Sequence, residues 1–287
     1  MKFRTEIQPL KGLQGSICHN SKIWTIGSCF ADNVGDRMLA QGFDVEVNPL
    51  GTLYNPLSIL RSVSAVIEGK VYTPDEFFQH EGKWRNYDFH SIFAKSTPEA
   101  SATMVNSTLD RLRAQLPELS VMILTLGSAR CFRRVDTGAV VANCHKQNPA
   151  LFRVDDITPE ICFEAISETI SLLQRAAPKL HTVILTVSPI RHIGYGLHAD
   201  RLSKSALLLA ADRAAHTSDS ISYFPSYEIM IDDLRDYRFY AADMVHPSEV
   251  AVDYIYDLFS RTYYYEATLT EAASRLREFR RSCHIPR

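Results

Sequence analysis

The fold is decided by the stretch Ile23-Trp24-Thr25-Ile26-Gly27-Ser28-Cys29-Phe30-Ala31-Asp32-Asn33. Its first four residues are apolar or β-branched, which is typical of a short strand. Gly27 permits a tight turn, Ser28 is a good helix N-cap residue, and apolar residues recur at helical spacing over 30–39. A strand that turns directly into a helix leaves free backbone N–H groups at the corner. Ser28 or Cys29 then stands over the sheet, in a position that suits a nucleophile.

The same corner also has a purely structural interpretation. Gly-Ser at a strand end is a common turn, and cysteine is often a small buried hydrophobic residue. Other parts of the sequence are needed to distinguish a catalytic corner from a structural one.

Composition excludes several classes of protein. The 287 residues carry a formal net charge of −2, and 46% of them are hydrophobic. The charge gives no general case for a nucleic-acid or membrane partner, and no apolar run has the ~20 residues that a membrane helix needs. The start of the chain lacks the apolar core of a signal peptide, so we expect a cytoplasmic protein. The length suits one large α/β domain or two small ones, and we expect a single domain over residues 1–287. The six cysteines are widely scattered, which predicts neither a disulfide framework nor a zinc ribbon.

Hydrophobic patterning predicts alternating strands and helices. Strands are expected near 23–27, 43–47, 121–126, 182–187 and 221–224. Helices are expected from the Gly27 corner to about Gly42 and near 56–67, 98–116, 159–176, 200–216, 248–264 and 267–282. In the 200–216 helix, Leu202, Ala206, Leu209 and Ala210 are expected on one buried face. The alternation predicts an α/β fold with a five-stranded parallel sheet covered on both faces.

Two segments interrupt this alternation. The segment Asp136-Thr137-Gly138 lies between two short strand-like runs and predicts a hairpin. An aromatic-rich insertion at about 70–97 fits neither a helical nor a strand period. We expect most of its aromatic side chains to be packed inside an irregular insertion.

Polar clusters follow the predicted strands at residues 27–29, 48–55, 127–128 and 188–192. In parallel sheets, ligands bind beyond the carboxyl ends of the strands. The clusters therefore predict a site at one edge of the sheet.

The segment Asp243-Met244-Val245-His246-Pro247 precedes the penultimate helix. Proline pushes His246 toward an extended backbone, so Asp243 and His246 can point the same way. The carboxylate can then hold one imidazole nitrogen while the other faces a nucleophile. A loop histidine beside an acid is common in proteins. The pair therefore indicates a catalytic site only if the sheet edge supplies a nucleophile.

Gly-Ser-Cys-Phe-Ala at 27–31 resembles the motif of the GSCFA domain family, within the SGNH/GDSL hydrolase-like superfamily. The resemblance extends through the segments 48–51, 143–146, 188–192 and 243–247. It implies a flavodoxin-like three-layer α/β/α sandwich with strand order 2-1-3-4-5. It also implies esterase, lipase or acyltransferase activity, often on acylated sugars.

The resemblance assigns roles residue by residue. Gly27, Ser28 and Cys29 stand where relatives have Gly, Asp and the nucleophilic Ser, while Asp243 and His246 match the closing Asp-x-x-His block. The implied oxyanion donors are Cys29, Gly51, Gly127 and Asn143. Ala129 stands where the third block has Asn, so Asn143 or Asn55 is the replacement donor. The expected substrate-binding residues are Asn55, His145, Arg191 and His192. For Arg191 the alternative is that it fixes a loop through hydrogen bonds to the backbone.

These patterns predict a hydrolase or acyltransferase acting on an ester, with a small-molecule or carbohydrate ester as substrate and no cofactor. Cys29 is the preferred nucleophile and Ser28 the N-cap, since partial positive charge at a helix N-terminus stabilises a thiolate. Ser28 as nucleophile remains open. A chemically idle carbohydrate- or acyl-binding module on the same fold is the main alternative. A metal site of Cys144, His145, His192 and His246 ranks low, because no two of them have ligand spacing on one element.

Overall fold

The computed structural model describes residues 5–10 and 13–283. The first four residues, on which part of the expectation about the start of the chain rests, lie outside these ranges. The central sheet consists of β1 (Lys22–Gly27), β2 (Asp44–Val47), β5 (Val121–Leu126), β9 (Thr182–Val187) and β10 (Ile221–Phe224). Every neighbouring pair in this sheet is parallel, and the spatial order is β2-β1-β5-β9-β10. The predicted α/β fold and the strand order 2-1-3-4-5 are confirmed.

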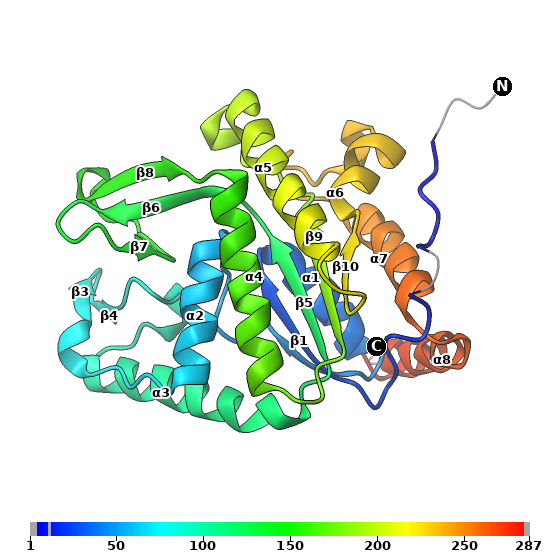
Figure 1. Cartoon of the computed structure of the whole chain (residues 1–287), viewed down its shortest axis with the longest axis horizontal. Coiled ribbons are helices and arrows are strands. Elements are labelled where there is room, and N and C mark those ends of the chain that lie inside the picture. The colour runs from blue at the N-terminus through cyan, green and yellow to red at the C-terminus, as the bar shows by residue number, and fades with distance from the viewer. Residues whose placement is uncertain (1–4, 11–12, 284–287) are drawn as a thin grey trace.

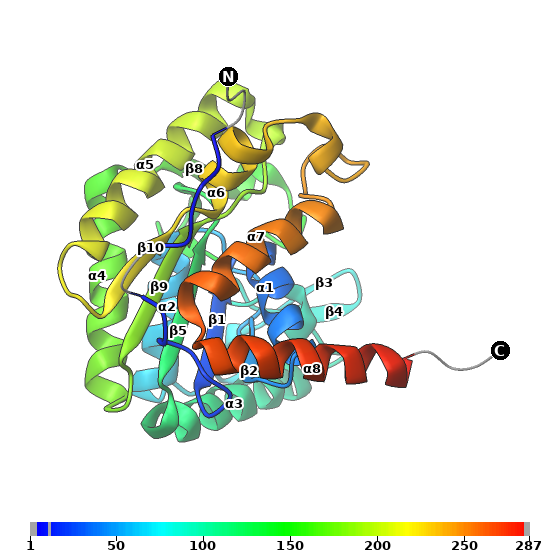
Figure 2. The same ribbon diagram turned by 90° about the vertical axis from the view of Figure 1, so that its right-hand side faces the viewer.

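Helices cover both faces of this sheet. Successive side chains of each strand point to opposite faces, and both faces are apolar. Trp24 and Ile26 of β1 lie in one core cluster, which includes residues of α2 (Pro56–Glu68), α3 (Pro98–Gln115), α4 (Pro159–Ala176) and α5 (Leu197–Ala215). Ile23 lies in the other cluster, with α1 (Cys29–Ala40), α7 (Glu249–Tyr263) and α8 (Glu266–Cys283). Figure 1 shows α2, α4 and α5 on the near face, and Figure 2 shows α1, α7 and α8 on the other.

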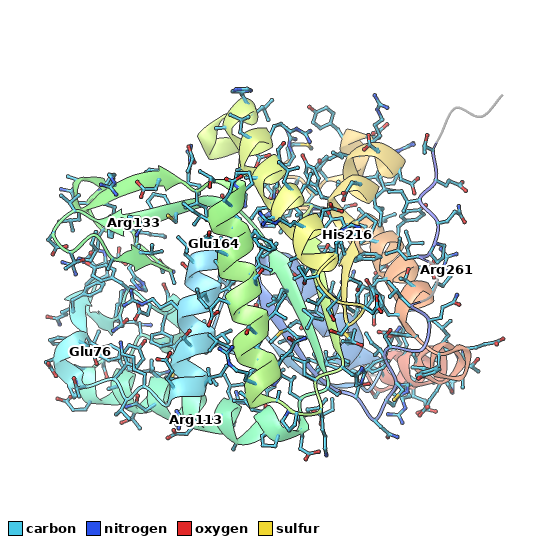
Figure 3. The ribbon with its side chains drawn as sticks, in the orientation of Figure 1. Glu76, Arg113, Arg133, Glu164, His216 and Arg261 are labelled. Carbon is cyan, nitrogen blue, oxygen red and sulfur yellow. The ribbon has the colours of Figure 1, made fainter. Side chains whose placement is uncertain are left out.

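The solvent-facing sides of these helices carry charge. Glu164 of α4 and Arg261 of α7 are labelled in Figure 3, and Arg261 is exposed. In the described part of the chain, no helix combines the length and the apolar composition that crossing a membrane requires.

Two smaller sheets lie outside the central one. The predicted hairpin pairs β6 (Arg130–Arg134) with β7 (Val140–Val141), and β8 (Phe152–Asp156), which was not predicted, pairs with the other side of β6. The aromatic-rich insertion contains a further unpredicted hairpin of β3 (Phe78–His80) and β4 (Lys83–Arg85). Phe77, Phe89 and Phe93 of this insertion are buried in the core.

Shorter helical segments connect these elements. They are the 3₁₀ turns η1 (Pro74–Glu76), η2 (Ser91–Phe93), η3 (Leu116–Glu118), η4 (Pro149–Leu151), η5 (Ile193–Tyr195) and η7 (Tyr237–Phe239), the short helix α6 (Ser226–Glu228) and the π-helix η6 (Ile229–Leu234). The segments α6 and η6 follow β10 and were not predicted.

The buried face of α5 contains two of the four residues expected on it, Ala206 and Ala210. Leu202 and Leu209 are exposed, whereas Ser203, Lys204 and Leu207 are buried. Apolar residues occur all around this helix, so the pattern of leucines alone indicated the wrong stripe. The polar residues of the buried stripe lie near the site described below.

Gly27 ends β1 at a point where no side chain fits. Its φ is +141°, and a Cβ at this position would lie 2.0 Å from the carbonyl oxygen of Thr125 on β5. A backbone atom cannot move aside without breaking the pairing of β1 with β5. Glycine is therefore required here both by space and by backbone conformation.

We predict that Gly27→Ala lowers the free energy of unfolding by about 3 kcal/mol, since it adds an overpacked atom to a strained φ. Urea unfolding followed by far-UV circular dichroism measures the loss. Gly138→Ala is the matched control, because Gly138 has a φ of +70° but no atom within 4 Å of the place that a Cβ would take. The control isolates the backbone cost, about 1 kcal/mol. Equal losses in the two variants would contradict the close approach to Thr125.

Candidate active site

The corner after β1 separates the roles of Ser28 and Cys29. Ser28 is only 1% exposed, and its Oγ accepts a hydrogen bond from the backbone N–H of Phe30 at 3.3 Å. It is thus the N-cap of α1, as predicted. Cys29 is the first residue of that helix and is partly exposed. Its N–H belongs to the first turn, where no acceptor exists within the helix.

Asn48, which follows β2, holds this corner in place. Its side-chain oxygen accepts from the N–H of Gly27 at 2.9 Å, and its NH₂ group donates to the carbonyl oxygen of Ser28 at 3.3 Å and to Asp32 at 2.8 Å. Asn48 is buried and has a φ of +40°, a conformation that asparagine tolerates better than most residues. One amide side chain therefore ties the strand end, the turn and the first helical turn together.

The chain brings the distant pair of residues to this corner. His246 Nε2 lies 3.6 Å from Cys29 Sγ, and His246 Nδ1 lies 2.6 Å from Asp243 Oδ2. The predicted contact between His246 and Asp243 and the predicted approach to the corner are both present. A thiol, an imidazole and a carboxylate therefore stand in line, which is the arrangement that a nucleophile, a base and an orienting acid require.

Asp243 also stabilises the loop that carries Asp243 and His246. Asp243 Oδ1 accepts from the backbone N–H groups of Val245 and His246 at 2.9 and 3.0 Å. These contacts and the bond from the His246 side chain lower the pKa of Asp243 to about 2. The carboxylate is therefore ionised at neutral pH and holds the Nδ1 side of the ring, which leaves Nε2 toward the sulfur.

Arg191 braces the same loop from the segment that follows β9. Its backbone N–H donates to the carbonyl oxygen of Val245 at 3.1 Å, and its guanidinium donates to that of Met244 at 3.1 Å. The guanidinium also lies over the rings of Tyr237 and Tyr240. These contacts fit the loop-fixing role rather than the expected substrate-binding role of Arg191.

The thiol of Cys29 does not have the lowered pKa expected at a helix N-terminus. Burial, and secondly the negative charge of Asp32, raise the pKa of the Cys29 thiol to about 11. Asp32 lies in the first turn of α1, and its own pKa is raised by burial. The sulfur is therefore protonated near neutral pH and would need a base to become a nucleophile.

A buried lysine lies beneath the site. Lys204 of α5 is 1% exposed, and its ammonium group donates to the carbonyl oxygens of Gly127 at 2.7 Å and Ser188 at 2.9 Å. It thereby joins the carboxyl ends of β5 and β9. Burial lowers the pKa of Lys204 to about 8, and its charge acts to lower the pKa of Cys29.

Three of the expected site residues have other partners. The N–H of Gly51 donates to the carbonyl oxygen of Asn48 at 2.7 Å, and that of Gly127 to Tyr54 at 2.9 Å. Neither glycine N–H is thus free to bind an oxyanion, and the expectation for both was wrong. His145 is 3% exposed, and its ring nitrogens contact the carbonyl oxygen of Asn86 at 2.9 Å and the hydroxyl of Ser91 at 3.3 Å. It anchors the insertion instead of facing a substrate.

The other expected residues lie at the same edge of the sheet. Asn55 and Asn143 line one cavity together with Tyr54. The ring of His192 packs edge-on against that of Tyr54, with centroids 5.7 Å apart. Burial lowers the pKa of His192 to about 4, so this ring is neutral at pH 7.

The metal interpretation gains no support from the geometry. Within residues 5–10 and 13–283, no group of three or more His, Cys, Asp or Glu side chains is arranged to hold a metal ion.

Three residues that contact or surround the corner were not predicted as site residues: Asn48, Asp32 and Lys204. Asn48 opens a turn-rich loop, and an acid in the first turn of a helix is an ordinary feature. Lysine is almost never fully buried, so the sequence gives no reason to place Lys204 beneath a site. Only the fold reveals that all three converge on one corner.

Comparison with known proteins places the chain in a family. Residues 22–259 match the model of the GSCFA family. Among solved structures, the fold is similar to a carbohydrate esterase family 3 protein from Talaromyces cellulolyticus, with a TM-score of 0.41 and 10% sequence identity, over 88% of this chain and 99% of that one. No curated protein sequence matches the chain. Because the family model spans most of its length and includes the Cys29 corner and the His246 loop, the chain belongs to the GSCFA family.

Proposed function

We propose that this protein cleaves or transfers the acyl group of an ester, with Cys29 as nucleophile, His246 as base and Asp243 as the acid that orients the base. The observation that carries the proposal is the 3.6 Å separation of Cys29 Sγ and His246 Nε2, combined with the 2.6 Å contact of His246 Nδ1 and Asp243. Ser28 is buried and occupied as the N-cap, which favours Cys29 over the serine.

The reaction proceeds through a thioester. Cys29 Sγ forms a bond to the carbonyl carbon of the ester while His246 Nε2 takes the thiol proton. The tetrahedral intermediate collapses, the bond between carbon and the leaving-group oxygen breaks, and His246 returns the proton to that oxygen. A water or an acceptor hydroxyl then attacks the thioester while His246 takes its proton. The carbon–sulfur bond breaks, and the proton goes back to sulfur.

The raised pKa of Cys29 shapes this mechanism. A thiol with a pKa of about 11 is not a preformed thiolate at pH 7, so proton removal accompanies attack on the carbonyl. His246 therefore works as a general base, in the way that histidine activates a serine hydroxyl. The N–H of Cys29 is the backbone donor for the developing oxyanion, and the amides of Asn55 and Asn143 are the side-chain donors. One such donor is typically worth ~3 kcal/mol of barrier.

The burial of the thiol also favours a second candidate. A protein on this fold whose cysteine stays protonated would bind an acyl or carbohydrate ligand without cleaving it. The two candidates differ in whether a covalent acyl-cysteine forms, which a mass spectrum of the intact protein detects.

We predict that Cys29→Ala lowers kcat/KM for p-nitrophenyl esters by about three orders of magnitude, because the thioester cannot form. Hydrolysis is followed by release of p-nitrophenolate, with the wild type and Cys18→Ala as references. Cys18 is also partly exposed, but it lies beside Ser21 and not at the site. Full activity in Cys29→Ala would transfer the role to another residue, and absence of ester cleavage in the wild type would favour the binding module.

We predict that Asp32→Asn accelerates alkylation of Cys29 by iodoacetamide at pH 8, by up to about tenfold. Removing the negative charge lowers the thiol pKa and raises the thiolate fraction. An asparagine oxygen can still accept from Asn48, so the corner is preserved. Rate constants over pH 6–11 with peptide mapping measure the effect.

The control for this experiment is Asp36→Asn, an exposed position one turn further along α1. It is expected to change the alkylation rate little. An unchanged or slower rate in Asp32→Asn would show that the Asp32 carboxylate does not hold the thiol protonated.

A further inference from the structure

The small sheet β7-β6-β8 has apolar side chains on both faces. Cys131 of β6 faces the core and is fully buried. Its neighbour Phe132 points the other way and pairs across the sheet with Val141 on one side and Val154 on the other. These three side chains form a row on the same face. Val154 is 49% exposed, so part of this row is not covered by the rest of the chain.

The row forms one wall of a cavity of about 340 Å³. That size falls at the lower end of typical small-molecule sites. The lining residues come from the loop before α2, from all three strands and from the segment between β7 and β8. They include Tyr54, Asn55, Phe132, Val141, Asn143 and Val154.

The lining offers no free charge. Arg130 is its only charged side chain among the described residues, and Asp156 binds that guanidinium with two hydrogen bonds of 2.7 and 2.9 Å. A neutral group with an apolar body therefore suits the cavity better than an anion or a cation.

Two amides supply hydrogen-bond donors at the cavity. The side-chain oxygen of Asn55 accepts from Ser58 at 2.8 Å, and that of Asn143 accepts from His145 at 2.7 Å. These bonds fix the orientation of both amides and commit their oxygens to the backbone. Among the described residues neither NH₂ group has an acceptor, so both can donate to a ligand atom such as a carbonyl oxygen.

Tyr54 places this cavity next to the Cys29 corner. Its carbonyl oxygen accepts from the N–H groups of Gly127 and Ser128, both at 2.9 Å. A Cβ on Gly127 would lie 3.1 Å from the Tyr54 ring and 3.2 Å from Ser28 Cβ. Tyr54 therefore lines the cavity and also lies beside Gly127, which adjoins Ser28 at the Cys29 corner.

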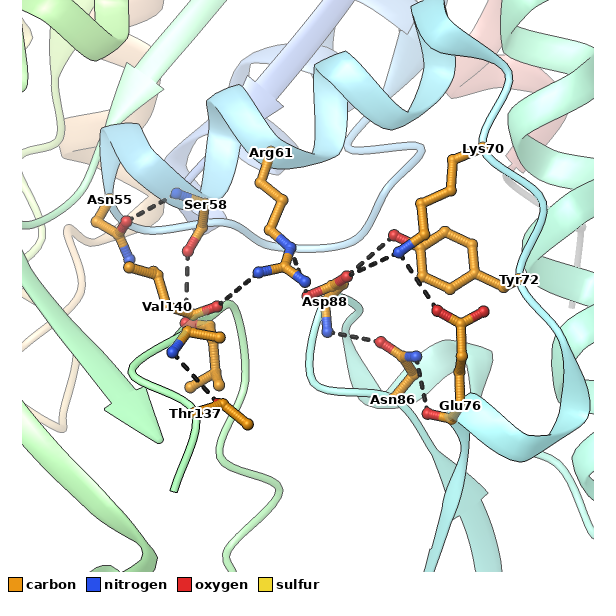
Figure 4. A network of polar contacts seen from close by, with 12 residues as sticks. Asn55, Ser58, Arg61, Lys70, Tyr72, Glu76, Asn86, Asp88, Thr137 and Val140 are labelled. Atoms are coloured by element: carbon orange, nitrogen blue, oxygen red, sulfur yellow. Dashed lines mark hydrogen bonds and ion pairs between the residues drawn. The ribbon is translucent and has the colours of Figure 1, made fainter. Parts of the chain in front are cut away.

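Contacts from α2 hold part of the cavity wall in place. Arg61 donates to the carbonyl oxygen of Val140 at 3.4 Å and pairs with the buried Asp88 of the insertion at 2.8 Å (Figure 4). Ser58 donates to Val141, and Asn55 caps the same helix. Helix α2 thus supports both Asn55 and the β7 end of the apolar row.

We propose that this cavity holds the acyl part of the ester, as an apolar acyl group with more carbons than acetyl. The inference rests on the proposed function and adds the substrate class. The apolar row contacts the acyl body, and the amides of Asn55 and Asn143 face its carbonyl oxygen. The leaving group lies outside the cavity, toward solvent.

The test compares p-nitrophenyl acetate, butyrate, octanoate and benzoate in the wild type and in Val154→Trp. The wild type is expected to have a higher kcat/KM for octanoate or benzoate than for acetate, and the two esters distinguish an alkyl from an aryl group. Val154→Trp fills the cavity from a half-exposed position. It is expected to lower kcat/KM for the preferred larger ester about tenfold and to leave acetate within about twofold.

Val135→Trp is the matched control, an exposed valine just beyond the end of β6 that does not line the cavity. It is expected to change neither ester. A wild type that prefers acetate, or a Val154→Trp variant that keeps its chain-length preference, would overturn the acyl cavity and leave the Cys29 chemistry standing.

A wild type that cleaves none of these esters would refute the proposed function, and the cavity is then tested by binding. Isothermal titration calorimetry with N-methyloctanamide and N-methylbenzamide, two neutral amides, measures this directly. Binding of either amide that is lost in Val154→Trp and kept in Val135→Trp supports the cavity as an acyl site. No binding of either amide to the wild type, or equal binding to all three proteins, overturns it.

Discussion

The arrangement of the whole site depends on the absence of a side chain at Gly27. The α-carbon of this residue lies so close to the backbone of Thr125 that a Cβ would overlap its carbonyl oxygen. The two central strands can therefore stay paired to the point where β1 turns into α1. Cys29 then begins the helix directly above the sheet, where the loops after the neighbouring strands can reach it. A wider corner would move the thiol away from His246, which approaches from a segment more than two hundred residues later.

Local patterning was sufficient to predict the sheet. Continuous apolar runs such as 121–126 and 182–187 are long enough to be distinct, and glycine or proline follows each of them closely. The hairpin β3–β4 and the strand β8 were not predicted. These strands are short and partly exposed, so apolar and polar residues do not alternate clearly along them. In α5, Leu202 and Leu209 were expected to be buried because they are apolar, but both are exposed. Tertiary context, not propensity, decides such cases.

The same limit applies to the site. Cys29, His246 and Asp243 could be assembled from motif and sheet topology alone. The N–H groups of Gly51 and Gly127 could not be excluded in this way, because their carbonyl partners are fixed only by the folded loops. The raised pKa of Cys29 also could not be predicted from the sequence. It depends on how much water reaches the sulfur and on the position of Asp32, and a helix N-terminus by itself would have acted in the opposite direction.

The two halves of the site rest on very different supports. Cys29 is fixed by a buried strand, a buried amide and a helix, whereas Asp243 and His246 are about half exposed and stand on a loop held by Arg191 and by its own turn. Segments of the second kind open at a small fraction of the cost of global unfolding. Amide hydrogens of Val245 and His246 would then exchange with solvent far faster than those of β1. In the mechanism proposed above, opening of this one loop would remove His246 from Cys29 while the thiol stays in place, so the reaction would be interrupted without loss of the fold.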